Sequence, residues 1–349
     1  MLRTLQLSGS PPQPTVDQSW MARAIALAAR ARYRTSPNPM VGAVVVDARG
    51  EPAGEGYHRR PGAPHAEVEA LRAAGERARG GTLYVSLEPC VHQGRTPPCT
   101  EAVVAAGLRR VVVAMLDPDP RVSGRGLERL REAGIEVELG PLEARARKLN
   151  EFYVKHRSTG RPFVSVKFAA SLDGKIATRT GHSRWITGPL ARAHAHRLRH
   201  RHDAILVGVN TVLRDDPALT ARFPGARQPL KIVLDSRGRT PPTARVRDGR
   251  FLIDGGRDLP GLLDRLGSMG IISLLVEGGA TVHGSFFDAG LVDRVYAYLA
   301  PIVVGGREAP SAVGGRGPAV VTESLRLHRL RIQRLGDDLL IVGDVHRDR

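Results

Sequence analysis

Apolar and polar residues follow two different periods along the chain, and segments of the two kinds take turns. Helical spacing of apolar residues occurs in segments 17–34, 66–79, 100–106 and 126–133. Runs typical of buried strands lie between them, namely MVGAVVVD, TLYVSL, RRVVVAML and IEVEL. Strands that alternate with helices predict an α/β layer structure, in which helices cover both faces of a sheet.

A second series of the same kind begins after residue 160. Its expected strands are FVSVKFAAS, DAILVGV, LKIVLDS, RFLID, ISLLVEG and RVYAYLAPIVV, with helices around 189–200 and 285–290. A polar, helical stretch separates the two series and ends at HRSTGRP. We therefore expect two α/β domains with separate cores. The expected boundaries are a disordered lead-in at 1–16, a first domain at 17–150, a linker at 151–160 and a second domain at 161–349.

Length and composition agree with this division. A chain of 349 residues with 42% hydrophobic residues can bury two cores of ordinary size. It contains no run of 18 apolar residues, so no membrane partner is expected. The first sixteen residues lack the long apolar region of a signal peptide, and the expected location is therefore the cytoplasm.

The formal net charge of +17 is the strongest anomaly in the composition. A basic balance can indicate nucleic acid, an anionic membrane surface or phosphorylated small molecules. Only five of the 52 basic residues are Lys, and the Arg residues are scattered. Aromatic residues make up 4%, too few for the stacking platforms of single-strand binders. We expect a solvated Arg-rich surface with a few positions for phosphate, and no nucleic-acid partner.

The first domain carries a set of residues suited to zinc. His65 and Glu67 open an expected helix, Cys90 follows a strand, and Cys99 begins the next helix. One His and two Cys supply three zinc ligands and leave the fourth position for water. Glu67 is then free to move protons during hydrolysis, as the general acid/base of zinc-dependent base deaminases does.

The same residues are compatible with roles that do not involve catalysis. Two Cys can form a disulfide in a secreted protein, and a lone His-x-Glu more often marks the start of a surface helix. A structural zinc site usually has four protein ligands, so the three-ligand set and Glu67 favour catalysis. Eight residues, VHQGRTPP, separate the two Cys instead of the usual two, and this loop carries His92 and Arg95 as candidate substrate-binding groups.

Three segments of this half, TSPNPMVGAVVV, HAEVEALRAAGE and SLEPCVHQGRTPPC, resemble the deaminase domain of the bifunctional riboflavin-biosynthesis deaminase/reductases. The resemblance implies a cytidine-deaminase-like α/β/α fold, zinc ligands at His65, Cys90 and Cys99, and Glu67 as the proton shuttle. It also implies that Asn38 contacts the substrate. Val91 departs from the small hydroxyl residue usual in the family, which leaves the catalytic positions intact.

In the second half, the turn Glu277-Gly278-Gly279-Ala280-Thr281 lies between an apolar strand and an expected helix. Glycines there let backbone N–H groups approach a phosphate, although such a turn is more often a packing feature. Asp235-Ser236-Arg237, after the strand KIVL, offers either a 2′-phosphate contact or an ordinary surface turn.

The segments VKFAASLDGKIAT, SRWIT, ILVGVNTVLRDDPALTAR, IVLDS and LLVEGGATV resemble the reductase half of the same family. This resemblance implies a dihydrofolate-reductase-like α/β domain that uses NADPH. The residues implied for NADPH are Ala169, Trp185, Thr211, Asp215, Ser236, Gly279, Ala280, Thr281, Val282, His283, Gly284 and Ser285. The residues implied for the substrate are Ser183, Arg199, Leu219, Arg222 and Glu277. An Arg fork matches phosphate oxygens, although a lone Arg is more often a surface residue.

The expected function is zinc-dependent deamination of 2,5-diamino-6-ribosylamino-pyrimidinone 5′-phosphate, followed by NADPH-dependent reduction of the ribosyl group to ribityl. The partners are a phosphorylated pyrimidine and, by resemblance, further copies of the chain in a dimer or tetramer. One alternative is a nucleic-acid deaminase, which the positive net charge favours and the few aromatic residues oppose. The other two are a regulator with a structural zinc site and a chain in which one of the two domains has lost its activity.

Overall fold

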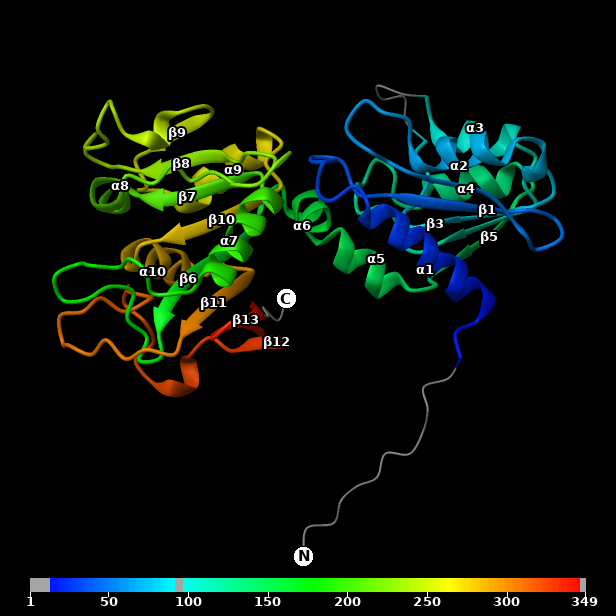
Figure 1. Cartoon of the computed structure of the whole chain (residues 1–349). Coiled ribbons are helices and arrows are strands. Elements are labelled where there is room, and N and C mark those ends of the chain that lie inside the picture. Colours follow the sequence, from blue (N-terminus) through cyan, green and yellow to red (C-terminus); the bar gives the residue numbers. More distant parts are fainter. Residues whose placement is uncertain (1–12, 92–96, 346–349) are drawn as a thin grey trace, which may run out of the picture. The chain divides into compact units, whose positions relative to one another are not determined.

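The computed structural model describes residues 13–91 and 97–345, and the chain forms two compact units that divide between Asn150 and Glu151 (Figure 1). Each unit contains one sheet with helices on both faces, as expected for two α/β domains. Within the described residues, no helix is both long and apolar enough to cross a membrane.

The sheet of the first unit is mixed. Its strand order is β2-β1-β3-β4-β5, with β1 antiparallel to both of its neighbours and β3, β4 and β5 parallel. The strands are β1 (Gly42–Val46), β2 (Pro52–Tyr57), β3 (Thr82–Val85), β4 (Arg110–Val113) and β5 (Glu136–Leu139). The carboxyl ends of the parallel strands β3 and β4 lead into the loops that carry Glu88, Cys90 and Asp117.

Helices enclose this sheet. One face carries α1 (Val16–Ala29) and α5 (Glu143–Leu149), and the other carries α2 (Ala66–Ala74), α3 (Cys99–Ala105) and α4 (Arg125–Glu132) (Figure 1). Strand β1 is buried on both faces: Ala43 and Val45 pack in the cluster that contains α2, while Gly42 lies directly against the α1 backbone. A capping box at Thr15 starts α1 at Val16, one residue earlier than expected.

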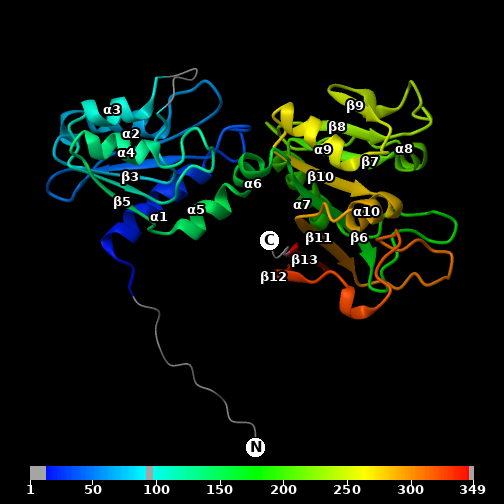
Figure 2. The ribbon, with the colours of Figure 1, turned by 180° about the vertical axis from the view of Figure 1, so that it is seen from behind.

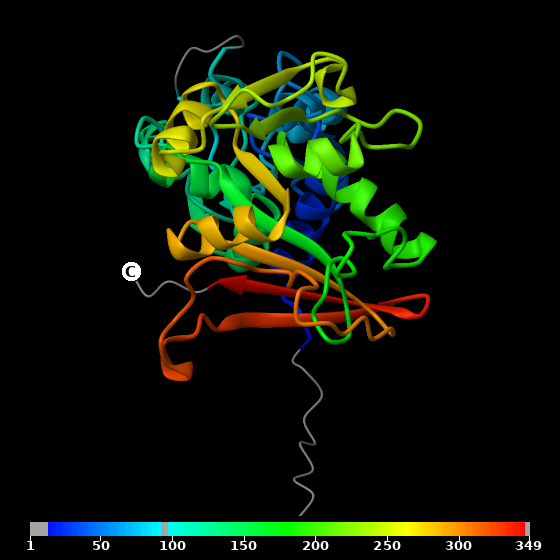
Figure 3. The same cartoon turned by 90° about the vertical axis from the view of Figure 1, so that its left-hand side faces the viewer.

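The second unit contains an eight-stranded sheet in the order β12-β13-β11-β6-β10-β7-β8-β9 (Figures 2 and 3). The six strands from β11 to β9 are parallel, and the antiparallel ribbon of β13 and β12 extends the sheet beyond β11. The strand bounds are β6 (Phe163–Ser171), β7 (Ala204–Gly208), β8 (Leu230–Leu234), β9 (Phe251–Asp254), β10 (Ser273–Gly278), β11 (Arg294–Ala300), β12 (Leu327–Leu335) and β13 (Asp338–Val345).

Two apolar clusters fill the two sides of this sheet. One contains α9 (Leu259–Ser268) and Phe286 of α10 (Ala280–Asp288), and the other contains α7 (Pro189–Arg201) and α8 (Val209–Asp215). The sequence patterns indicated a helix near 285–290, but α10 begins directly after Gly279.

Short 3-10 turns complete the described secondary structure of the two units, at Gly75–Ala78, Arg245–Arg247 and Val321–Glu323.

Residues 151–160, expected as a linker, contain α6 (Glu151–Thr159), which belongs to the second unit. Arg294 of β11 is almost fully buried and contacts both carboxylate oxygens of Glu151, at 2.5 and 2.7 Å. Its Nε also donates to Asp344 of β13. This buried cluster ties α6 to the sheet, which explains why the polar segment is an ordered helix.

Candidate active sites

Three sulfur and nitrogen ligand atoms converge at the carboxyl end of β3. His65 is the N-cap residue of α2, Cys90 lies in the loop after β3, and Cys99 opens α3. The Cys90 and Cys99 Sγ atoms lie 3.5 Å apart, and His65 Nδ1 lies 3.7 Å from Cys90 Sγ and 2.9 Å from Cys99 Sγ. All three ligand atoms lie within 4.8 Å of one another.

This donor set fits zinc. Tetrahedral zinc–thiolate and zinc–imidazole bonds place ligand atoms roughly 3.5–3.8 Å apart, which matches two of the three distances. The third distance, 2.9 Å between His65 Nδ1 and Cys99 Sγ, is that of a direct hydrogen bond. A bound zinc ion would replace this hydrogen bond. A hydrogen bond from the Cys99 thiol, helped by one from its backbone N–H, lowers the pKa of Cys90, and the same thiol–thiolate bond raises the pKa of Cys99. Zinc binding requires both thiolates and would replace this bond.

Glu67 lies two residues after His65, in the first turn of α2, and its side chain is buried beside Cys99. Burial raises the pKa of Glu67 to about 7 in the metal-free chain. A bound dication would lower this pKa again. Burial and a bound metal thus act on the Glu67 pKa in opposite directions, and the carboxyl group lies next to the three ligand atoms.

Asn38 lies beside a histidine that the sequence patterns did not single out. His58 is buried, its Nδ1 lies 3.2 Å from the Pro64 carbonyl, and its Nε2 lies 3.3 Å from Asn38 Nδ2. A carbonyl can only accept, so Nδ1 carries the proton and Nε2 accepts from Asn38. The His58 ring also packs edge-on against His65 at 5.4 Å. Asn38 is thus linked through one histidine ring to the ligand His65.

Glu88 is a second residue that sequence reasoning missed. Its buried carboxylate accepts hydrogen bonds from the backbone N–H groups of Asp117, Gly124 and Gly126, at 2.9–3.1 Å. These contacts fasten the loop that carries Cys90 to the segment leading into α4. The segment LEPC places Glu88 two residues before the ligand Cys90, which is a local signal for a role near the metal. The three N–H groups that it binds lie 29 to 38 residues further along the chain, so the contacts themselves leave no local pattern.

In the second unit, Arg199 and Glu277 form a buried pair. Arg199 Nε and Nη2 donate to the two Glu277 carboxylate oxygens at 2.7 and 2.8 Å, and Lys167 Nζ lies 3.5 Å from the same carboxylate. Burial alone would raise the pKa of Glu277, but the charges of Arg199 and Lys167 hold it well below its usual range. Lys167 was not selected from the sequence, although one of only five Lys, placed within an apolar strand, is a usable signal.

The glycine turn between β10 and α10 meets α8. Gly278 has a φ of +116°, and a Cβ there would lie 3.1 Å from the His283 ring, so this position requires glycine. The Gly279 N–H donates to Thr211 Oγ1 at 3.3 Å, which joins two residues implied for NADPH. Gly279 is the N-cap residue of α10 and has no side-chain cap, so backbone N–H groups of the first turn remain for a ligand such as a phosphate.

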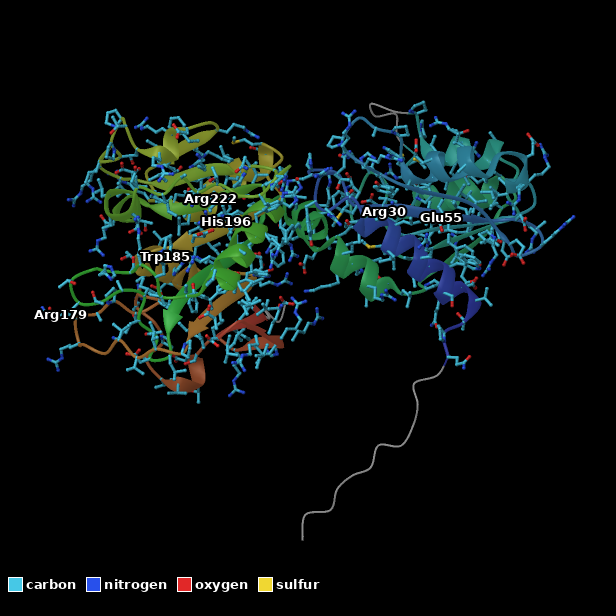
Figure 4. All side chains as sticks on the ribbon, viewed as in Figure 1. Arg30, Glu55, Arg179, Trp185, His196 and Arg222 are labelled. Atoms are coloured by element: carbon cyan, nitrogen blue, oxygen red, sulfur yellow. The ribbon has the colours of Figure 1, made fainter. Side chains whose placement is uncertain are left out.

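The remaining residues implied for NADPH lie on several elements. Ala169 is in β6, Asp215 ends α8, and Ser236 follows β8; Trp185 is 69% exposed with the Arg192 guanidinium 4.6 Å from its ring centroid (Figure 4). Within α10, Ala280, Thr281, Val282 and Ser285 are exposed or half-buried, whereas His283 and Gly284 are buried. Across the described residues, no hydrogen bond joins Ser236 to the other NADPH positions.

The other residues implied for the substrate also have defined places. Ser183 is half-buried in the segment before α7, Leu219 is buried with a positive φ of 51°, and Arg222 is exposed. His92 and Arg95 lie outside the described residues. The Asp235 carboxylate accepts hydrogen bonds within its own loop, from Arg237 N and from the N–H and hydroxyl of Thr240, so its role there is structural.

Comparison with known proteins identifies the families of the two units. The family model of the cytidine and deoxycytidylate deaminase zinc-binding region matches residues 14–115, and that of the RibD C-terminal domain matches residues 162–341. The riboflavin biosynthesis protein RibD of Aquifex aeolicus is 44% identical, over 93% of this chain and 98% of its own. That of Escherichia coli is 46% identical, over 83% and 89%.

Solved structures agree as well. The Acinetobacter baumannii RibD structure has a TM-score of 0.89 and 40% identity, covering 95% of this chain and 99% of its own. A Thermotoga maritima structure, described as a diaminohydroxyphosphoribosylaminopyrimidine deaminase/5-amino-6-(5-phosphoribosylamino)uracil reductase, has a TM-score of 0.86 and 35% identity, with the same coverage. The expected two-domain fold, the zinc and NADPH cofactors and the paired activities are thereby confirmed. The chain belongs to the RibD family of bifunctional riboflavin-biosynthesis deaminase/reductases.

Proposed function

We propose that this chain deaminates 2,5-diamino-6-ribosylamino-pyrimidinone 5′-phosphate in its first unit and reduces the ribosyl group of the product in its second, with the residue roles given below. The single observation that carries this proposal is the convergence of His65, Cys90 and Cys99 beside the buried Glu67 carboxylate. Three ligands fit a catalytic zinc site, which keeps one position for water.

In the first unit, His65, Cys90 and Cys99 hold zinc, which when bound lowers the pKa of water and supplies hydroxide at neutral pH. Glu67 accepts the proton of that water and delivers it to the ring nitrogen and then to the departing ammonia. Asn38 binds the pyrimidine, and its side chain is oriented by the hydrogen bond to His58.

In the second unit, the substrate is held by Arg199, Glu277, Ser183, Leu219 and Arg222. Its phosphate lies at the two guanidinium groups, because the ionised Glu277 carboxylate can accept only from hydroxyl or N–H groups. NADPH supplies a hydride to the ribosyl carbon when it is bound. The Gly279–Ser285 turn of α10, with Thr211 beside it, and Ala169, Trp185, Asp215 and Ser236 orient this cofactor. The bidentate contact between Arg199 and Glu277 fixes the guanidinium before substrate arrives.

The experiment follows NADPH absorbance and ammonia release when the diamino substrate is added to wild-type enzyme and to a Glu67→Gln variant. Wild type should release ammonia and consume NADPH. The variant should do neither, and already-deaminated substrate should restore NADPH consumption. Glu69→Gln, on the same helix but paired with Arg72 at the surface, is the matched control and should behave as wild type. Ammonia release without NADPH consumption in the wild type would refute the reductase assignment.

We also propose that the chain works in the cytoplasm as a homo-oligomer, a dimer or tetramer, formed through the second unit. Strand β12 is the edge of its sheet (Figure 3), and Leu330 and Ile332 on it are 57% and 68% exposed. An edge strand presents unpaired backbone N–H and C=O groups that can pair with another chain, and these two exposed apolar side chains would be covered by such pairing. Light scattering should show an oligomer that Ile332→Lys shifts toward monomer. A monomeric wild type would refute this part of the proposal.

A further inference from the structure

Two side chains of α7 form hydrogen bonds to the same backbone carbonyl. His196 and Arg199 lie one turn apart on this helix, and both reach the carbonyl oxygen of Thr220, from His196 Nδ1 and from Arg199 Nη1, each at 3.1 Å. The segment that follows Thr220 is held by a pair of hydrogen bonds between Gln228 and Ala221. The imidazole and the guanidinium are therefore fixed side by side.

The hydrogen bond to Thr220 defines the proton position on the His196 ring. A carbonyl oxygen can only accept, so Nδ1 carries a proton and, in the neutral ring, Nε2 carries a lone pair. Within the described part of the chain, this Nε2 has no hydrogen-bond partner. A neutral ring would present a lone pair to an incoming anion, whereas a protonated ring would present an N–H donor.

The charges around His196 come from three segments. Arg199 lies on α7 itself, Arg222 lies in the segment after α8, and Glu277 lies on β10. The Arg199 guanidinium forms an ion pair with the Glu277 carboxylate through two hydrogen bonds. In the described structure, no carboxylate forms an ion pair with Arg222. Figure 4 shows His196 and Arg222 close together, as their electrostatic interaction also requires. The site thus holds the positive charge of Arg222, which no carboxylate neutralises within the described residues, beside the His196 ring, which becomes positively charged when it binds a proton.

Burial, together with the charges of Arg199 and Arg222, lowers the pKa of His196, against the opposing effects of the Thr220 carbonyl and Glu277. The ring is therefore neutral at neutral pH in the free protein. A phosphate monoester carries about −1.5 to −2 charges at that pH. Placed beside Nε2, such an anion reverses the electrostatic balance at the ring and favours its protonated form.

We propose that His196 is a third ligand of the substrate phosphate, and that it takes up one proton from solvent at Nε2 when the phosphate binds beside Arg199 and Arg222. The inference rests on the substrate-binding roles proposed above for these two Arg residues. No covalent bond changes: the proton moves from water or buffer to Nε2, which then donates a hydrogen bond to a phosphate oxygen. Substrate affinity of the reductase unit accordingly falls as pH rises.

The test is isothermal titration of the full chain with ribose 5-phosphate at about pH 7.5, where this ester is mostly a dianion, in two buffers of different ionisation enthalpy. Wild type should take up a measurable fraction of a proton for each ester bound. His196→Asn keeps a side-chain donor for Thr220 but cannot titrate. It should lose the proton uptake and bind about tenfold more weakly at pH values near 6.5, where the lost bond is charge-assisted. The two proteins should converge at alkaline pH.

A kinetic readout separates binding from chemistry. With deaminated substrate and NADPH, His196→Asn should raise the KM of the substrate about tenfold while leaving kcat unchanged, because the phosphate is remote from the carbon that receives hydride. Loss of kcat with an unchanged KM would overturn the proposal, as would proton uptake equal to that of wild type.

Two variants complete the design. His200→Asn, one turn further along α7, changes a histidine that accepts from the Arg227 backbone and should leave both proton uptake and affinity as in wild type. Arg222→Gln should weaken binding of the ester. Weak binding by Arg222→Gln with wild-type behaviour of His196→Asn would refute the role of His196 alone. Unchanged binding by Arg222→Gln would instead refute the substrate site proposed for the second unit.

Discussion

The Gly126 backbone N–H donates to the Glu88 carboxylate at 2.9 Å, at a point where the two segments touch so closely that a Cβ on Gly126 would lie 2.2 Å from the Pro89 carbonyl oxygen. Pro89 directly precedes the ligand Cys90. The first turn of α4 therefore supports one zinc ligand from behind, through a contact that only glycine permits.

Substitution of Gly126 should therefore weaken metal binding. Gly126→Ala forces its methyl group against the Pro89 backbone, which must move together with Cys90. We expect zinc content per chain, measured by elemental analysis after dialysis, to fall at least severalfold, together with ammonia release. Gly255→Ala is the control, because Gly255 has open space around it and no left-handed φ. Full zinc occupancy in Gly126→Ala would contradict the supporting role of this contact.

Removal of zinc should separate the two activities. The ligands His65, Cys90 and Cys99 all lie in the first unit, and the second unit has its own sheet and apolar clusters. Treatment with a chelator should abolish ammonia release and leave NADPH oxidation with already-deaminated substrate unchanged. Added zinc should restore ammonia release in wild type but not in Cys99→Ser. Loss of both activities on chelation would show that the second unit also depends on the metal.

The pair of Arg199 and Glu277 should give the second unit a defined acid sensitivity. The folded-state pKa of Glu277 lies below its unfolded value of about 4.3, so its contribution to stability is complete above about pH 5 and is lost as the pH falls through the folded pKa. Glu277→Gln leaves Arg199 buried without its carboxylate and should cost about 3–5 kcal/mol of unfolding free energy at neutral pH. This difference from wild type should shrink as the solution is made more acidic.

Fluorescence can follow that unit alone, because Trp185 lies in it and the other tryptophan, Trp20, lies in the first. Denaturation of Glu277→Gln in a Trp20→Phe background therefore measures the predicted difference. Glu323→Gln, at an exposed carboxylate of the same unit, should be indistinguishable from its parent. A cost for Glu277→Gln that stays constant with pH would show that charge pairing is not its cause.

The hydrogen bond between Thr211 and Gly279 should contribute to NADPH binding. Thr211→Val keeps the shape of the side chain but removes the acceptor of the Gly279 N–H, which frees the first turn of α10. We expect the KM for NADPH to rise about fivefold, the effect of losing one neutral hydrogen bond. Thr211→Ser retains the hydroxyl and should restore most of the affinity. If Thr211→Ser were as impaired as Thr211→Val, the methyl group would be the important part of the side chain.

Local patterns were enough to predict the zinc cluster. His65 and Glu67 share one helix start, and Cys90 and Cys99 flank one loop, so their spacing in sequence already limits their spacing in space. The helix and strand series likewise predicted two α/β domains. The second unit continues beyond β11 into the ribbon of β12 and β13, which was not predicted because most residues of β12 are exposed and give no alternating pattern.

The supporting contacts could not be predicted in this way. Glu88 bonds to residues 29–38 positions away, Lys167 reaches a carboxylate 110 positions away, and nothing periodic in the sequence marks either contact. The sequence predicts a linker at 151–160 for a related reason. Its polar residues indicate solvent, but Glu151 is neutralised by Arg294, which comes 143 positions later. A polar pattern predicts exposure to solvent, but an ion pair with a distant segment allows the same polar residues to pack against the sheet.

The peptide bond between Asn150 and Glu151, where the two compact units meet in sequence, has a consequence for metabolic supply. Each ribosome that finishes one catalyst also finishes the other, so the cell holds the two in a fixed one-to-one ratio at every level of expression. Changes in gene dosage therefore cannot alter the ratio of the two activities. This ratio is set by the turnover numbers and affinities of the two sites, so mutations in those sites are the means of adjusting it.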